Sequence, residues 1–209
     1  DVCSSDLNRP EKLNALNLAL WKAVGDSVRA LSKDDSVRCI VLRGAGDKSF
    51  SPGADISEFA NERANAKAAT RYAKVTDATL LTIHTCRHPT VAMLQGLCVG
   101  GGLEVASVCD LRICGEGTRL GVPVARIGVV VPHLEMKALL DLVGYATALE
   151  ILLEGRVLGA AEAKEKGLVT RVVSDAELEK ETYATAQRIA AGAPLGHRWH
   201  KKFRSEEHT

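Results

Sequence analysis

The chain has 209 residues, of which 46% are hydrophobic and 25% charged, and its formal net charge is +1. This composition is typical of a globular protein with one sizeable α/β domain. It contains no apolar run near the ~20 residues of a membrane span and no basic, apolar export signal at its start. We therefore expect a cytoplasmic protein without a membrane or nucleic-acid partner. The six cysteines form no CxxC pair and have no histidine at metal spacing, so we expect reduced thiols and no metal site.

The two ends differ in character from the rest. Residues 1–7 and 204–209 match what common sequencing adapters encode in one reading frame, and we expect both to be read-through. Without them the chain keeps 26 basic and 22 acidic residues, a net charge of +4. The genuine sequence would then occupy about 8–203.

Helical and strand-like patterns alternate along the chain. Apolar residues recur at helical spacing over 16–31, and 37–43 is a short apolar strand. One or two helices are predicted over 60–87, ending before Pro89. Further strands are predicted at 90–94, 111–114 and 168–173, with a return at 95–99 and a loop at 123–132. Helices are predicted at 102–108, 134–143, 146–153, 160–166 and 175–191. This alternation predicts an α/β domain in which helices cover sheets.

Two glycine-bearing turns are the most informative feature, 51–56 (SPGADI) and 100–104 (GGGLE). Each follows a predicted strand and opens a predicted helix, so each can direct a backbone N–H at one point. Two such donors that converge would form an oxyanion hole, with Glu104 one turn inside the second helix. The alternative is that both are tight turns and that Glu104 only complements the helix dipole.

Four segments together resemble the crotonase, or enoyl-CoA hydratase/isomerase, superfamily. They fall in the family's order and span most of 8–203. The segments are 8–17 (NRPEKLNALN), 48–56 (KSFSPGADI), 95–104 (QGLCVGGGLE) with 109–110 (CD), and 161–163 (AEA) with 167–169 (GLV).

The resemblance implies a spiral of ββα units with two roughly perpendicular sheets. It implies a core over 8–192, the start of a truncated C-terminal helical segment over 193–203, and a homotrimer or hexamer in the full-length protein. It also assigns the oxyanion donors to the N–H groups of Ala54 and Gly101. Glu104 matches the family's first catalytic carboxylate, which would move a proton at carbon or hold a water.

One position departs from the hydratase pattern. Hydratases of the family carry a second Glu directly after a proline, where this chain has Val124 after Pro123. Glu135 and His133 are candidates for the missing group, although helix capping or surface exposure is the reading we favour for both. Glu135 is the better candidate because it has the same chemistry.

Substrate-binding residues follow from the same resemblance. Residues of two segments match positions that lie along coenzyme A in relatives: Lys12, Leu13, Ala15, Asp55, Ile56 and Ser57. Lys12 could equally be a solvated loop charge. No dinucleotide, triphosphate or serine-hydrolase motif is present. We expect no separate cofactor, because coenzyme A is part of the substrate.

These residues favour an enzyme that stabilises the enolate of an acyl-CoA thioester. Hydration of a 2-enoyl-CoA is the first expectation. A 3,2-enoyl-CoA isomerase that uses Glu104 alone, and a non-catalytic acyl-CoA-binding paralogue, stay open because of Val124. An RNA-binding role is disfavoured by the modest charge.

Overall fold

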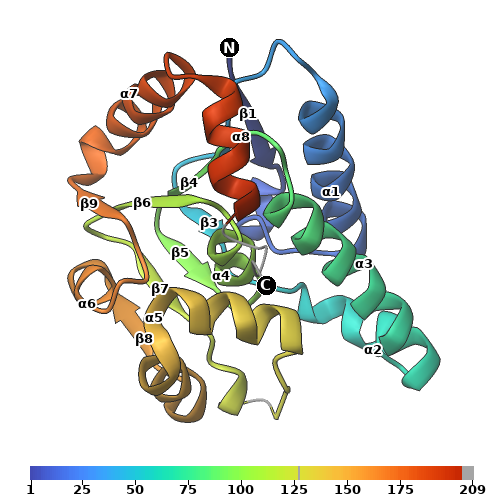
Figure 1. Ribbon diagram of the computed structural model, residues 1–209. Helices are drawn as coiled ribbons and strands as arrows, with labels where there is room; N and C mark the ends of the chain where they lie inside the picture. The colour runs from blue at the N-terminus through green and yellow to red at the C-terminus, as the bar shows by residue number, and fades with distance from the viewer. Residues whose placement is uncertain (127, 204–209) are drawn as a thin grey trace.

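A five-stranded parallel sheet and a smaller four-stranded sheet organise the chain (Figure 1). The computed structural model describes residues 1–126 and 128–203. The larger sheet has the strand order β1-β2-β4-β6-β9, and the smaller β3-β5-β7-β8, in which β8 alone runs antiparallel to its neighbour. The larger sheet contains β1 (Val2–Leu7), β2 (Cys39–Gly44), β4 (Thr90–Leu94), β6 (Leu111–Gly115) and β9 (Arg171–Val173). The smaller contains β3 (Ser49–Ser51), β5 (Leu97–Val99), β7 (Arg119–Gly121) and β8 (Val157–Gly159).

Eight helices connect and cover the strands in the described ranges. They are α1 (Leu18–Lys33), α2 (Phe59–Glu62), α3 (Ala66–His84), α4 (Gly101–Ser107), α5 (His133–Glu154), α6 (Ala160–Glu165), α7 (Leu178–Ala190) and α8 (Pro194–Phe203). Side chains cap two of the longer ones: Asn17 accepts from the N–H of Leu20, and Asn65 from that of Ala68. No helix in the described part of the chain is long and apolar enough to cross a bilayer.

The chain repeats one pattern of two strands followed by a helix. β2 enters the larger sheet, β3 the smaller, and α2 and α3 follow; β4, β5 and α4 repeat this, as do β6, β7 and α5. Successive turns therefore stack in parallel within each sheet. The expected spiral of ββα units is confirmed, and this stacking places the starts of α4 and α5 beside the segment before α2.

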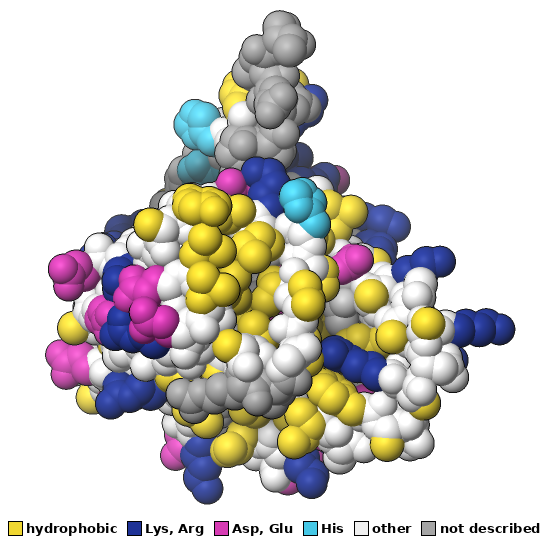
Figure 2. Space-filling model, turned by 90° about the horizontal axis from the view of Figure 1, so that it is seen from below, with side chains coloured by type: hydrophobic (Ala, Val, Ile, Leu, Met, Phe, Trp, Pro, Cys, Tyr) yellow, Lys and Arg dark blue, Asp and Glu magenta, His cyan; other side chains and the backbone are white. Residues whose placement is uncertain are grey.

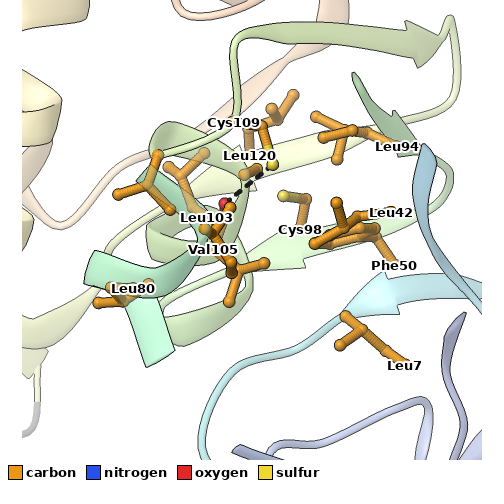
Figure 3. Packing of buried hydrophobic residues seen from close by; sticks show 14 of the residues in the cluster. Leu7, Leu42, Phe50, Leu80, Leu94, Cys98, Leu103, Val105, Cys109 and Leu120 are labelled. Atoms are coloured by element: carbon orange, nitrogen blue, oxygen red, sulfur yellow. Dashed lines mark hydrogen bonds between the residues drawn. The ribbon is translucent and has the colours of Figure 1, made fainter. Parts of the chain in front are cut away.

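The main hydrophobic core lies between the sheets and helices α1, α3, α4 and α5. Leu42, Phe50 and Leu94 of three strands meet Leu103 and Val105 of α4 there (Figure 3). A smaller cluster on the other face of the larger sheet packs beneath α7. Its members are Cys39, Val41, Val91, Met93, Ile113, Leu178 and Ala186. Because both faces are covered, the central strands β2 and β4 are mostly apolar and lack an alternating pattern.

Most elements lie where the sequence predicts them, and the differences are local. Four strands were not predicted, β1 in the stretch expected to be read-through and the three-residue strands β3, β7 and β8, and β5 lies in the predicted return at 95–99. Three residues are too few to show a periodic pattern. The helices predicted at 134–143 and 146–153 form one element, α5, with a kink at Gly144, whose φ of 74° is non-helical.

The structure of the two chain ends can be compared with the domain boundaries expected from the sequence. Val2–Leu7 form β1 and pair in parallel with β2, so the sheet includes residues outside the expected core of 8–192. Whether an adapter encodes 1–7 is a property of the DNA and stays a prediction, and 204–209 lie outside the described residues. The expected start of the C-terminal helical segment, 193–203, contains α8. Lys201 of α8 pairs with Asp110 at 2.6 Å and donates to the carbonyl of His88.

Candidate active site

The two glycine-bearing turns meet. A Cβ built on Gly53 would lie 3.3 Å from the backbone nitrogen of Gly101 and 2.9 Å from the carbonyl oxygen of Val99. Gly53 and Gly100 have φ values of +102° and +52°, in the region that favours glycine. The glycines are therefore needed both for their backbone conformation and for the close approach of one turn to the other.

Both expected donors lie on this meeting point. The N–H of Leu16 donates to Gly53, and the N–H of Asp55 donates back to Leu16, so the N–H of Ala54 between them points the other way. Gly101 is the first residue of α4, where an N–H has no partner within the helix. No described backbone oxygen accepts from either N–H. Ala54 and Gly101 also line one cavity of about 270 Å³.

Glu104 lies one turn into α4 and lines the same cavity. Enclosure by protein is the main cause that raises the pKa of this half-buried carboxyl to about 8, and the negative charges of Glu135 and Asp77 contribute to that rise. The positive charge of Arg63 lowers the pKa of Glu104. A carboxyl with this pKa keeps its proton near neutral pH and can deliver it to a carbon next to the oxyanion donors.

Glu135 is buried, with 5% of its surface exposed, and lines the cavity from the first turn of α5. Burial is the main cause that raises its pKa, and Asp77 adds to it. The reading of Glu135 as a surface-exposed residue is therefore wrong, because its side chain is buried at the cavity. His133, two residues earlier, is exposed as expected.

The rest of the cavity wall is largely apolar. Val124 lies on it, so the position at which the resemblance led us to look for a second Glu lines the cavity here with a hydrocarbon side chain. The neighbouring loop adds further apolar residues: Pro123, Val129, Val130, Val131 and Pro132. Hydrophobic side chains gather across the middle of the face seen from below (Figure 2). Such a wall excludes water and suits an acyl chain.

Residues of α1, α2 and α3 that were not singled out from the sequence complete the site. Arg63 stacks over the rings of Phe59 and Tyr72, at 4.2 and 4.4 Å from their centroids. Trp21 is buried in the core, and its indole N–H donates to the Tyr72 hydroxyl at 3.0 Å. The sequence holds one signal for this cluster, because Phe59 and Arg63 are four apart and so share a helix face.

The segments expected along coenzyme A lie side by side. Arg9 joins them, because its guanidinium pairs with Asp55 at 3.0 Å and donates to the carbonyl of Ala15 at 2.8 Å. Asp55 also accepts from the hydroxyl and N–H of Ser57, and these bonds, with Arg9, lower the pKa of its carboxyl. Lys12 and Leu13 are exposed beside them.

Ile56 is 73% exposed at the cavity and lines it. Of the six expected residues, these contacts join Ala15, Asp55 and Ser57, and Ile56 lies on the wall of the cavity that Ala54 and Gly101 also line. It gives Asp55 a structural role, since its carboxylate holds the two segments together.

Comparison with known proteins identifies the chain's relatives. A model of the enoyl-CoA hydratase/isomerase family matches residues 1–207. The crotonyl-CoA hydratase of Syntrophomonas wolfei is 33% identical over 200 residues, which cover 96% of this chain and 76% of that protein. A peroxisomal Delta(3,5)-Delta(2,4)-dienoyl-CoA isomerase of Arabidopsis thaliana is 32% identical over 200 residues, covering 90% of this chain and 72% of that one.

A solved structure agrees with the sequence comparison. The crystal structure of an enoyl-CoA hydratase/carnithine racemase from Magnetospirillum magneticum matches with a TM-score of 0.95 and 48% identity, over 97% of this chain and 76% of that one. The match extends over both sheets and the helices around the Glu104 cavity. The chain therefore belongs to the enoyl-CoA hydratase/isomerase family and is an enzyme of the lyase or isomerase type.

Proposed function

We propose that this enzyme binds an acyl-CoA thioester and stabilises its enolate between the N–H groups of Ala54 and Gly101. The observation that carries the proposal is the convergence of two unpaired backbone donors beside a carboxyl, Glu104, whose pKa is raised to about 8. Backbone donors stabilise an oxyanion without titrating, and removing one such donor typically costs about 2.7–4 kcal/mol of barrier lowering.

Hydration of a 2-enoyl-CoA to a 3-hydroxyacyl-CoA is the reaction that we propose. Water adds at the β-carbon, the thioester oxygen takes up negative charge, and the protonated carboxyl of Glu104 delivers its proton to the α-carbon. Hydration transfers no electrons, so the reaction needs no cofactor beyond the coenzyme A of the substrate. The relatives named as hydratases, such as that of Syntrophomonas wolfei, support this choice.

Isomerisation of a 3-enoyl-CoA is the second candidate, and Val124 is the observation that favours it. An apolar residue at this point of the wall offers nothing to hold a water, whereas moving a proton between two carbons needs one carboxylate. The relative named as a dienoyl-CoA isomerase shows that the family includes isomerases. A non-catalytic paralogue is disfavoured, since a raised pKa in a cleft is typical of a working acid or base.

Parallel incubation with crotonyl-CoA and with a 3-enoyl-CoA tests the proposal. We expect the enzyme to convert crotonyl-CoA to 3-hydroxybutyryl-CoA, and Glu104→Gln to lower the rate by about 10²–10⁴-fold. Consumption of the 3-enoyl-CoA alone would favour the isomerase. If neither thioester is consumed and Glu104→Gln changes nothing, the catalytic proposal fails. Assembly as a trimer or hexamer and a cytoplasmic location remain predictions.

A further inference from the structure

We propose that Glu135 is the second acid–base residue of this site, the group that takes a proton from the attacking water. The inference rests on the proposed hydration and gives α5, rather than the position of Val124, the role of supplying the second carboxylate. Two observations support it: the side chain of Glu135 is buried at the cavity wall, and its Oε2 atom has no hydrogen-bond partner among the described residues.

Glu135 lines the cavity, and one of its two carboxylate oxygens has no hydrogen-bond partner among the described residues. Only 5% of its surface is exposed, and its Oε2 atom accepts no hydrogen bond from the described residues. An unsatisfied buried carboxylate oxygen is costly, and such atoms are usually kept for a ligand, a water or a catalytic role. The side chain of Glu135 lines the cavity, so a carboxylate oxygen without a hydrogen-bond partner is held at the cavity wall.

Glu104 and Glu135 share the same space. Both line the main cavity, and both also line a small void of about 10 Å³ enclosed by Leu103, Val122, Leu139 and Leu152. One carboxyl comes from the first turn of α4 and the other from the first turn of α5, two helices in direct contact. Two carboxyls that face one cavity from different helices can act on the two ends of one double bond.

The charges around the pair couple the titrations of the two carboxyls. Besides burial, Glu135 from α5, Asp77 from α3 and Arg63 at the end of α2 act on Glu104, while Asp77 and a hydrogen bond from its own backbone N–H act on Glu135. A negative charge on Glu135 favours the protonated form of Glu104. The proposed step uses Glu135 as the carboxylate and Glu104 as the carboxylic acid.

The two carboxyls together account for both proton transfers of the hydration step. The Glu135 carboxylate takes a proton from water as its oxygen bonds to the β-carbon and the π electrons move toward the thioester oxygen. As the enolate collapses, Glu104 gives its proton to the α-carbon and becomes a carboxylate. Glu135 has gained one proton and Glu104 has lost one, so transfer of that proton back between them restores the starting state.

The test compares four forms of the full chain: wild type, Glu135→Gln, Glu135→Asp and, as a matched control on the exposed end of the same helix, Glu154→Gln. Crotonyl-CoA hydration gives kcat and KM, and carbon-13 NMR of labelled glutamate follows the titration of Glu104. Glutamine keeps the size of Glu135 and removes a buried charge, so we expect the fold to persist, which thermal unfolding checks.

We expect Glu135→Gln to lower kcat by about 10²–10⁴-fold with little change in KM, and Glu135→Asp to retain more activity than the amide. The pKa of Glu104 should fall in Glu135→Gln, because a like charge is removed, and stay unchanged in Glu154→Gln. The shift of that titration tests whether the charge of Glu135 acts on Glu104, and the higher activity of Glu135→Asp than of Glu135→Gln tests its role as a base.

The outcomes separate the two claims. If wild type hydrates crotonyl-CoA and Glu135→Gln does so at the same rate, while Glu104→Gln is slow, the role of Glu135 is wrong and the proposed function stands. If wild type does not hydrate crotonyl-CoA at all, the proposed hydration fails, and the role of Glu135 as its base fails with it.

Discussion

At the scale of single residues, the site depends on one carboxyl held in an unusual state. Glu104 could be proposed from the sequence because it follows the glycine triplet within one turn. Its raised pKa could not, because the groups that raise it come from α3 and α5, which are distant in sequence. Glu135 could likewise be named as a candidate from the sequence. Its burial could not be predicted, because it depends on how α5 packs against α4.

The titration of Glu104 predicts how stability changes with pH. Its pKa rises from 4.5 to about 8 in the folded protein, so the folded state binds this proton more tightly than the unfolded chain. The contribution of this proton to the free energy of unfolding is fully present below pH 4.5, the pKa of the unfolded chain. It is lost as the pH rises through about 8, the pKa of the folded protein. At about 1.4 kcal/mol per pKa unit, the loss amounts to a few kcal/mol. Thermal unfolding across this range should show a smaller decline for Glu104→Gln than for wild type, and parallel curves would contradict the assignment.

The Trp21–Tyr72 hydrogen bond gives a second prediction at this scale. Tyr72→Phe leaves the buried indole N–H of Trp21 without its 3.0 Å partner, which should lower the free energy of unfolding by about 1–3 kcal/mol. Urea unfolding measures this change. Tyr145→Phe is the control, because Tyr145 is 73% exposed, and we expect little effect from it. Equal effects of the two substitutions would show that the hydrogen bond contributes nothing specific.

At the scale of elements, the start of α4 is set by its contact with β3. A Cβ on Gly102 would lie 2.5 Å from the carbonyl oxygen of Ser51, closer than real contacts allow. The sequence shows the glycine triplet and predicts a helix after it, and the strand from 90 to 94 is predicted to the residue. It could not show β3, because that strand has three residues, and so it could not explain why Gly102 must be glycine.

Gly102→Ala should therefore act on catalysis as well as on stability. The added methyl group meets backbone atoms, so α4 must move and carry the N–H of Gly101 with it. We expect a loss of about 1–3 kcal/mol of stability together with a lower kcat on crotonyl-CoA. Gly196→Ala in α8 is the control, since its Cβ would meet nothing within 4 Å. Unchanged kcat in a folded Gly102→Ala enzyme would argue against the role of this contact.

At the scale of the whole molecule, the ββα spiral explains how residues from distant segments reach one cavity. Each turn of the spiral contributes one wall: the 51–56 segment and Arg63 from the first, α4 from the second, and the loop before α5 with Glu135 from the third. The order of strands and helices predicted this class of fold. Which side chains meet inside it depended on the packing of the three turns.

Hydration of crotonyl-CoA in deuterium oxide tests the central claim most directly. If Glu104 delivers the proton to the α-carbon of a thioester whose oxygen is held by Ala54 and Gly101, the product carries one deuterium at that carbon. Glu104→Gln should then form this product about 10²–10⁴-fold more slowly. NMR of the product detects the label. Wild-type rates of deuterium incorporation in Glu104→Gln, or no product from the wild-type enzyme, would contradict the account.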